Sequence, residues 1–211
     1  MAEHVPDATV SRLITYLRVL EELERLGKVK TSSEEIAELA QVTAFQVRKD
    51  LAYFGSYGTR GVGYSVPLLK RELMRILGLS RRWRLGIVGM GRLGQALADY
   101  PGLRRAFEPV GFFDVDPEKI GKPAGGGVIE PLSKLEEAVR ERGIEIGLIA
   151  TPAEAAQEVA DRLVRAGIKG ILNFAPTVLE VPKSVPVENV DFLAGLGRLT
   201  FFIKRKEEEL V

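Results

Sequence analysis

Leu85-Gly-Ile-Val-Gly-Met-Gly-Arg-Leu-Gly94 is the stretch that decides the fold of the second half of this 211-residue chain. Its apolar start, Leu85–Val88, predicts a buried strand, and the helical pattern from Leu93 to Tyr100 predicts a helix directly after a turn. The three glycines between them are spaced as Gly89-x-Gly91-x-x-Gly94. In a strand–turn–helix unit, such glycines permit a tight turn, close approach of a pyrophosphate and close packing of helix on strand. The stretch therefore predicts a dinucleotide-binding unit.

The residues around this turn predict a phosphate site and a ribose site. The helix that begins there offers free backbone N–H groups and the positive end of its dipole to the phosphates. Twenty residues beyond Gly94, Asp114 ends the apolar stretch Gly111-Phe-Phe-Asp114. An acid there hydrogen-bonds the adenosine ribose and repels a 2′-phosphate, which favours NAD(H) over NADP(H). Asp116 ranks second, because it can instead cap the turn at Pro117. The predicted contacts here are Gly89, Met90, Gly91, Arg92, Leu93, Gly94, Asp114 and Asp116.

The chain beyond Gly94 alternates apolar stretches with helical patterns. The apolar stretches are Val110–Phe113, Gly147–Ala150 and Ile171–Phe174, and the helical patterns are Leu132–Arg142 and Ala153–Ala166. Buried strands that alternate with helices predict a parallel, doubly wound sheet of Rossmann type. Ligands of such sheets lie outside the carboxyl ends of the strands. We therefore expect two strand ends to border the nicotinamide, the alternative being ordinary loops: Thr151 and Pro152, and Asn173, Phe174, Ala175 and Pro176.

A last amphipathic helix is predicted from Asp191 onward. Its apolar residues are Leu193, Leu196, Leu199, Phe201, Phe202 and Ile203. Side chains of this size need a surface to cover, either of this chain or of a second one. Phe192 would join Phe174, Ala175 and Pro176 in an apolar nicotinamide region. Such a region disfavours the charged ring of NAD+, so we predict that NADH binds more tightly.

The first 80 residues have a different pattern, of short helices followed by a glycine-rich hairpin. Leucines from Leu13 to Leu26 recur at helical spacing and Gly27 ends that helix. Ser32-Ser-Glu-Glu35 and Thr43-Ala-Phe-Gln46 are capping boxes that begin two further helices, with Ile36, Leu39 and Ala40 facing inward. Val62, Tyr64 and Val66 alternate and predict a hairpin, and a helix runs from Leu68 to Leu77. Two short helices joined by a tight turn predict a helix-turn-helix.

The third of these helices is the predicted DNA reader. Residues 45–82 hold eight basic and two acidic side chains, whereas residues 85–211 hold 16 basic and 19 acidic ones. A local basic region on a near-neutral chain indicates a polyanionic partner at one end, and a solvated face is the alternative. Arg60 is expected at the hairpin tip, suited to a minor groove. The candidate DNA contacts are Ser32, Ser33, Thr43, Phe45, Gln46, Arg48, Lys49, Tyr53 and Arg60, whereas Val42, Val47 and Leu51 are expected in the core.

Composition argues for a sensor rather than an enzyme. A dehydrogenase needs a proton donor or acceptor beside the hydride, often His or Lys. The one histidine is His4, and the chain has no cysteine, which excludes disulfides, thiolate catalysis and Cys-based metal sites. Residues 191–211 are too few for a substrate domain. We therefore predict no catalytic residue and no metal; the alternatives are a small NAD-dependent oxidoreductase with an N-terminal dimerisation domain, or a winged-helix module that binds CoA or another nucleotide.

The compartment is expected to be the cytoplasm. The apolar runs are far too short to span a bilayer, so we predict no membrane association. The start of the chain, Met-Ala-Glu-His-Val-Pro-Asp7, lacks the basic and apolar regions of a signal peptide. The absence of cysteine fits the same compartment.

Over nearly its full length the chain resembles the Rex family of redox-sensing transcriptional repressors. The matching stretches are Gln46–Leu51, Phe54–Tyr64, Gly89–Gly94, Phe113–Pro117, Asn173–Pro176 and Asp191–Leu196. The resemblance implies a winged-helix DNA-binding domain (residues 1–80), a Rossmann NAD(H)-binding domain (81–190) and a C-terminal helix (191–211) that is exchanged between subunits. The chain departs from the family at Ala150-Thr-Pro152, where members often carry a more apolar residue before the proline.

What the resemblance implies about function is specific. It describes a homodimer that binds double-stranded operator DNA, represses respiratory and fermentative genes, and leaves its operator when NADH rises, with NAD+ favouring the bound form. Arg18, Tyr100 and Asp191 resemble family positions that link the two domains. Phe192 would approach the nicotinamide or the interface between the domains.

Overall fold

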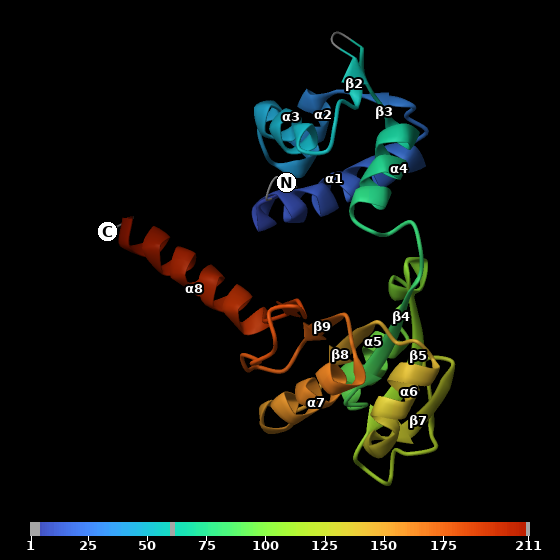
Figure 1. The fold of residues 1–211 in the computed structure, drawn as a ribbon. Coiled ribbons are helices and arrows are strands. Elements are labelled where there is room, and N and C mark those ends of the chain that lie inside the picture. Colours follow the sequence, from blue (N-terminus) through green and yellow to red (C-terminus); the bar gives the residue numbers. More distant parts are fainter. Residues whose placement is uncertain (1–4, 60–61, 210–211) are drawn as a thin grey trace. The chain divides into compact units, whose positions relative to one another are not determined.

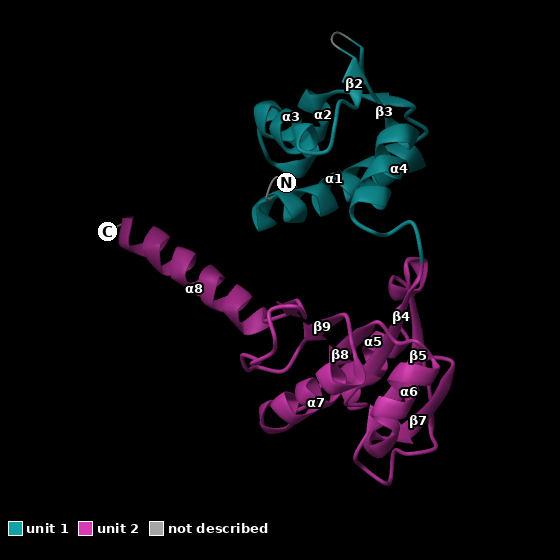
Figure 2. Cartoon of the chain, viewed as in Figure 1, with its two compact units in different colours: residues 1–81 teal, residues 82–211 magenta. Residues whose placement is uncertain are grey.

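The computed structural model describes residues 5–59 and 62–209 (Figure 1). The chain divides into two compact units, residues 1–81 and residues 82–211 (Figure 2). The boundary lies in the basic stretch Ser80–Arg84. Arg60, predicted at a hairpin tip, and His4 lie outside the described residues.

Unit 1 is a winged helix-turn-helix, as the sequence predicts. Its elements are α1 (Asp7–Arg25), β1 (Lys30–Thr31), α2 (Ser33–Ala40), α3 (Ala44–Ala52), β2 (Gly58–Thr59), β3 (Gly63–Ser65) and α4 (Val66–Ile76). The Ser32 hydroxyl accepts the N–H of Glu35, and the Thr43 hydroxyl accepts the N–H of Gln46, so both predicted caps begin their helices. Between α2 and α3 the chain turns at Gln41, which adopts a left-handed φ of 55°. The predicted hairpin is β2–β3, and β3 also pairs with β1, which the sequence did not indicate.

The core of unit 1 is built by α1, α2, α3 and α4. Its fully buried apolar side chains include Leu13, Leu20, Ile36, Val47, Leu69 and Leu73. Val47 and Leu51 are core residues, as predicted. The expectation for Leu39 was wrong, because this side chain is 52% exposed. Helix α2 buries Ile36 and Ala37, and two residues beyond Ala37 is half a helical turn, which points Leu39 to solvent.

Unit 2 contains the predicted Rossmann-type sheet. Its strand order is β10-β9-β8-β4-β5-β7-β6, parallel except for the edge strand β6. The elements are β4 (Trp83–Val88), α5 (Arg92–Ala98), β5 (Phe107–Asp114), β6 (Pro123–Ala124), β7 (Gly127–Pro131), α6 (Leu135–Glu141), β8 (Ile146–Ile149), α7 (Ala153–Ala166), β9 (Gly170–Asn173), β10 (Val187–Asn189) and α8 (Phe192–Glu209). The chain runs from β4 to β5 on one side and later to β8 on the other. The strand order thus reverses beside β4, where open α/β sheets bind their ligands.

Neighbouring residues of the central strands bury on opposite faces of this sheet. Ile87, Phe112 and Leu148 belong to the cluster on one face, and Val88, Phe113 and Ile149 to the cluster that contains residues of α6 and α7. A sheet covered on both faces needs strands that are apolar throughout, which is why the sequence predicted these strands. Strands β6, β7 and β10 are short and contain Pro, Gly or Glu, and no apolar pattern predicted them.

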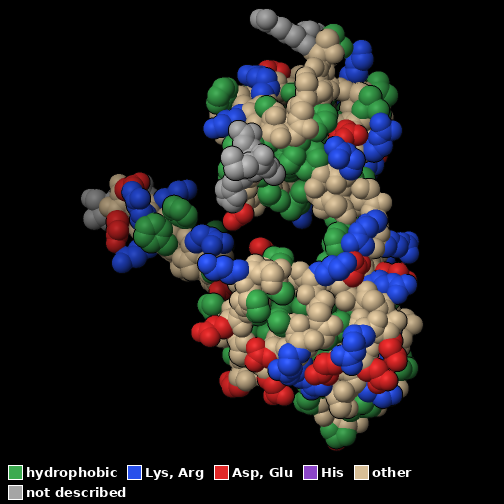
Figure 3. All heavy atoms as spheres, viewed as in Figure 1, with side chains coloured by type: hydrophobic (Ala, Val, Ile, Leu, Met, Phe, Trp, Pro, Cys, Tyr) green, Lys and Arg blue, Asp and Glu red, His purple; other side chains and the backbone are tan. Residues whose placement is uncertain are grey.

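Helix α8 differs from every other long helix described, because none of its residues is buried. Its large apolar side chains are between 54% and 67% exposed, and hydrophobic side chains stand on its surface (Figure 3). These are Phe192, Leu193, Leu196, Leu199, Phe201, Phe202 and Ile203. At 100° per residue, Phe192, Leu196, Leu199 and Ile203 lie along one face of the helix. The surface that they were expected to cover is not provided by the described residues of unit 2.

Candidate dinucleotide site and DNA-binding surface

The three glycines after β4 have the geometry that a phosphate turn requires. Gly89 has a φ of +94°, and a Cβ there would lie 2.6 Å from the carbonyl oxygen of Ala150. A Cβ on Gly94 would collide with the carbonyl oxygen of Gly89, so only glycine lets α5 pack this closely. A Cβ on Gly91, by contrast, would meet no atom within 4 Å. Gly89 and Gly94 are therefore required by the fold, and Gly91 faces the open space that a ligand would enter.

Asp114 lies at the carboxyl end of β5 and joins it to the glycine turn. Its Oδ2 accepts the Met90 N–H at 2.8 Å and the Lys119 Nζ at 3.1 Å, and its Oδ1 accepts the Asp116 N–H at 2.9 Å. Burial alone would raise the pKa of Asp114, but these donors outweigh burial and hold the pKa below its ordinary value. The carboxylate is therefore ionised at neutral pH.

Lys119 is the residue of this region that the sequence analysis missed. Its Nζ lies 3.1 Å from Asp114 and 3.4 Å from Asp116. Asp116 caps its own turn, because its Oδ1 accepts the Glu118 N–H at 2.9 Å. The lysine partly neutralises the two acids expected to repel a 2′-phosphate. The position of Lys119 in the sequence, at the end of Asp114-Val-Asp-Pro-Glu-Lys119, could have indicated that it lies close to these acids.

Two polar groups beside the glycine turn have no partner in the described chain. The Arg92 guanidinium, at the start of α5, has no hydrogen-bond or ion-pair partner among those residues. The Thr151 Oγ1 is buried and likewise unpaired, and the backbone nitrogen of Thr151 lies 2.9 Å from the position of a Cβ on Gly89. Leu93 is exposed and Pro152 precedes α7. A buried hydroxyl without a partner is costly, so these groups fit a site completed by an anionic ligand.

The loop after β9 and the start of α8 enclose a cavity of about 360 Å³. Its lining includes Asn173, Phe174, Ala175, Pro176, Asp191 and Phe192, all of them predicted site residues, together with Thr177, Val178, Asn189, Val190 and Leu193. Aromatic and aliphatic groups form most of this wall. The carboxylate of Asp191 accepts the Ala194 N–H at 3.0 Å and so caps α8. The cavity therefore has one wall from the loop and one from the C-terminal helix.

Asn173 organises this cavity from below. It is buried, and its Nδ2 donates to the carbonyl oxygens of Ala175 and Thr177 and to the Oδ1 of Asn189, at 3.2, 2.9 and 2.9 Å. Its Oδ1 accepts the Ala175 N–H at 3.0 Å. The amide of Asn173 is thus used within the chain, to shape the loop and to tie it to the strand that leads into α8.

Helix α3 presents two cations in unit 1. Lys49 is exposed and has no hydrogen-bond or ion-pair partner within the described residues. Arg48 is also exposed, and its Nη1 donates to the Ser33 Oγ at 2.7 Å and lies 3.1 Å from the Glu34 carboxylate. Phe45, in the first turn, is exposed as well. A groove of about 980 Å³ lies between α2, α3 and the β2–β3 hairpin, with Ser32, Ser33 and Arg48 in its lining. Tyr53 is half-buried at the end of α3.

The three predicted linking residues lie in different units. Arg18 is exposed on α1 of unit 1. Tyr100 is exposed just after α5 of unit 2, and Asp191 caps α8.

Among the described residues, no helix is long and apolar enough to cross a membrane, and no group of three or more His, Asp or Glu side chains is arranged to hold a metal ion.

Two family models match the chain. Residues 4–52 match a model described as a putative DNA-binding protein N-terminus, and residues 80–177 match one described as a CoA binding domain. The first covers the helices of the helix-turn-helix, and the second covers most of the Rossmann-type sheet.

Proteins of known name and structure are similar to this chain over nearly its full length. The redox-sensing transcriptional repressor Rex of Thermus thermophilus is 71% identical over 94% of this chain and 94% of its own. The crystal structure of RSP in complex with NAD+ and operator DNA is 38% identical, with a TM-score of 0.93 over 97% of this chain and 95% of that one. RSP in complex with NADH gives 37% identity and a TM-score of 0.90 over 99% and 100%. With such identity over nearly its full length, and with both predicted folds present, the chain belongs to the Rex family of redox-sensing transcriptional repressors.

Proposed function

We propose that this protein binds operator DNA through α3 of unit 1 as a homodimer, and that NADH bound to unit 2 releases it. The observation that carries the nucleotide part is the turn at residues 89–94. Open space lies before Gly91, and the unpaired Arg92 and Thr151 lie at or beside this turn. The backbone N–H groups at the start of α5 and the Arg92 guanidinium would hold the pyrophosphate. Asp114 would accept the hydroxyls of the adenosine ribose.

Asp114 also favours NAD(H) over CoA. The adenosine of CoA carries a 3′-phosphate, which would meet an ionised carboxylate at the end of β5. Lys119 reduces that repulsion without removing it, because its single charge is shared by Asp114 and Asp116. The match to a CoA-binding model is compatible with a shared Rossmann-type fold, since fold alone does not fix the ligand.

The nicotinamide ring would enter the cavity formed by Phe174, Ala175, Pro176 and Phe192. This wall favours the neutral ring of NADH, because burying an unpaired cation is costly. We expect NADH to bind roughly tenfold more tightly than NAD+, which direct calorimetric titration of the DNA-free protein with each nucleotide would measure. Equal affinities for the two nucleotides would contradict this placement of the ring.

Arg48 and Lys49 are the two basic residues among the predicted DNA contacts of the reader helix. We expect Arg48→Ala to lower affinity for the operator duplex, selected by the wild-type protein from a randomised pool, by about tenfold. Lys49→Ala should weaken binding to all duplexes about equally and reduce the slope of log affinity against log salt by roughly 1. Fluorescence anisotropy over a salt series checks both. Lys183→Ala, an exposed lysine of unit 2, is the control for the loss of one charge. If both variants of α3 bind like the wild type, α3 is not the reader.

The exposed apolar face of α8 supports the homodimer, because a second copy of the chain would cover that face. The start of α8 also lines the cavity. Exchange of α8 between subunits would therefore bring the cavity of each subunit close to the partner subunit. NADH in the cavity would then change the spacing of the two reader helices, with Arg18, Tyr100 and Asp191 linking the units. A ligand shifts such an equilibrium only by its different affinity for the two states. Binding to operator DNA also puts the protein in the cytoplasm.

A further inference from the structure

Asp50 lies in α3, a helix that is expected to meet the phosphates of DNA. An acid on such a helix would repel the DNA unless it is shielded. Asp50 is fully buried, in the same helix as the exposed Arg48 and Lys49. Asp50 lies in Gln46-Val-Arg-Lys-Asp-Leu51, one of the stretches that resemble the family. Each of the other five residues is a predicted DNA contact or a core residue, whereas Asp50 is neither.

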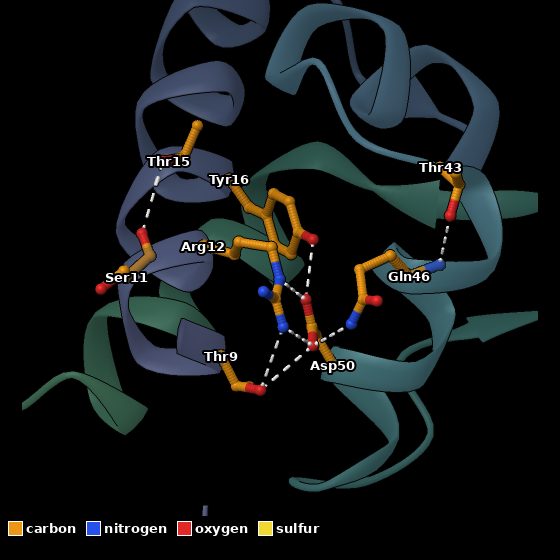
Figure 4. A network of polar contacts seen from close by, with 8 residues as sticks. All are labelled: Thr9, Ser11, Arg12, Thr15, Tyr16, Thr43, Gln46 and Asp50. Atoms are coloured by element: carbon orange, nitrogen blue, oxygen red, sulfur yellow. Dashed lines mark hydrogen bonds and ion pairs between the residues drawn. The ribbon is translucent and has the colours of Figure 1, made fainter. Parts of the chain in front are cut away.

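The Asp50 carboxylate is surrounded by donors from two helices (Figure 4). From α1, the Arg12 Nε and Nη2 donate at 2.6 and 2.8 Å, the Tyr16 hydroxyl donates at 2.8 Å and the Thr9 hydroxyl at 3.2 Å. From α3 itself, the Gln46 Nε2 donates at 2.8 Å. We call these five residues the Asp50 cluster. It ties the first half of α1 to the reader helix.

The cluster holds a charged rather than a neutral acid. Burial would raise the pKa of Asp50, but the hydrogen bonds from Arg12, Tyr16 and Gln46 outweigh it and hold the pKa below its ordinary value. Arg12 is bound in a two-pronged geometry, the strongest arrangement for an arginine and a carboxylate. Gln46, a predicted DNA contact, has its amide nitrogen held on Asp50, which fixes the orientation of its side chain.

We infer that Asp50 is a positioning residue, which sets α3 and the Gln46 side chain at the angle needed to read bases. This inference rests on the proposed binding of operator DNA. Base contacts require atoms placed to within fractions of an ångström, whereas contacts with phosphates tolerate small shifts. Asp50 therefore governs the discrimination between operator and other DNA more than the affinity for DNA in general.

Removing the charge of Asp50 should change DNA binding in a way that a loss of stability would not. Asp50→Asn keeps the size of the side chain but removes a negative charge and leaves the Arg12 guanidinium uncompensated. General affinity for DNA should then stay the same or rise, because unit 1 becomes more basic. Affinity for the operator should fall by about tenfold, the effect of one lost base contact. Loss of stability alone would lower both affinities together.

The test is to measure anisotropy of the full-length protein with the operator duplex and with a scrambled duplex of the same composition. Glu136→Gln is the matched control, because it breaks a two-pronged pair with Arg162 between α6 and α7 in unit 2. We expect the operator preference of Asp50→Asn to fall about tenfold and that of Glu136→Gln to stay unchanged. NADH affinity should be unchanged in Asp50→Asn. An unchanged preference in folded Asp50→Asn protein overturns the inference.

Tyr16→Phe keeps the inference testable if Asp50→Asn does not fold. It removes one hydrogen bond to Oδ2 and no charge. It should lower operator affinity several-fold and leave scrambled-duplex affinity unchanged; equal affinities for the operator in Tyr16→Phe and wild type would overturn the inference. If the wild-type protein shows no preference for the operator duplex, both the proposed function and this inference fail. If the wild type and the variants show the same preference, only the role of Asp50 fails.

Discussion

A protein with Asp114→Ala is expected to stay on its operator at NADH concentrations that release the wild type. The carboxylate would accept the ribose hydroxyls, and it also holds the Met90 N–H of the glycine turn at 2.8 Å. Its loss removes charge-assisted hydrogen bonds and loosens the turn, so NADH affinity should fall about 100-fold, or roughly 2.7 kcal/mol. Operator affinity without nucleotide should be unchanged, because unit 1 is intact.

Asp116→Ala is the control for this variant. Asp116 lies two residues further on and also faces Lys119, but its Oδ1 caps the turn through the Glu118 N–H. We expect its effect on NADH affinity to be less than about tenfold, the size of one turn hydrogen bond. The measurement is an NADH titration of each operator complex by anisotropy. If Asp114→Ala is released at the same NADH concentration as the wild type, Asp114 does not bind the dinucleotide.

The second large effect is expected on helix α8. Leu196 and Leu199 lie on the same face of α8 and are more than half exposed. Replacing both with Asp would place two carboxylates in the proposed subunit interface. The loss of two buried leucines alone is worth about 3–6 kcal/mol, so the dimer should weaken by at least about 100-fold. Operator affinity should fall with it, because a monomer binds only one half-site.

Sedimentation velocity over a concentration series measures the dimer, and anisotropy measures the operator. Arg205→Ala is the control, since Arg205 lies on another face of α8 and pairs with Glu209 in solvent. It should remain a dimer. A Leu196→Asp, Leu199→Asp protein that sediments as a dimer and binds its operator normally would show that α8 does not hold the subunits together.

Much of the fold was predictable because local signals agreed with tertiary demands. The capping boxes at Ser32 and Thr43 begin the helices that the sequence predicted. The spacing of the three glycines predicted the turn, and a Cβ would collide with backbone atoms at Gly89 and Gly94 but not at Gly91. Strands β4, β5 and β8 contain the apolar runs Leu85–Val88, Val110–Phe113 and Ile146–Ile149. Such runs predict buried strands without knowledge of the neighbouring strands.

The remainder depended on contacts between residues far apart in the chain. Leu39 was assigned to the core because its spacing from Ile36 fits a helix, but α2 turns another face inward. In the Asp50 cluster, Thr9, Arg12 and Tyr16 lie 34 to 41 positions from Asp50 in the sequence. Only Gln46 is close to it in the sequence, so no local pattern predicted the cluster. Asn173 was predicted as a ligand contact from its position at a strand end. Its bond to Asn189 could not be foreseen, because β10 had no recognisable pattern.

Asn173 and Asn189 also suggest how the proposed ligand would act. The loop after β9 and the start of α8 line the same cavity, and the bond between the two asparagines holds these walls together. A ring bound between Phe174 and Phe192 would therefore bear on the base of α8 directly. Since the described residues of unit 2 do not cover the apolar face of α8, and a second subunit is proposed to cover it, the ring would also influence the contact between the subunits.

The most direct test of the account is a titration of the wild-type operator complex with NADH, NAD+ and NADPH. The protein should leave the duplex as NADH rises and remain bound in NAD+ at the same concentration, and NADPH should be much weaker than NADH. By linkage, NADH should bind the DNA-free protein more tightly by the factor that it weakens DNA binding. A complex that persists in saturating NADH, or that NAD+ releases equally well, would contradict the account.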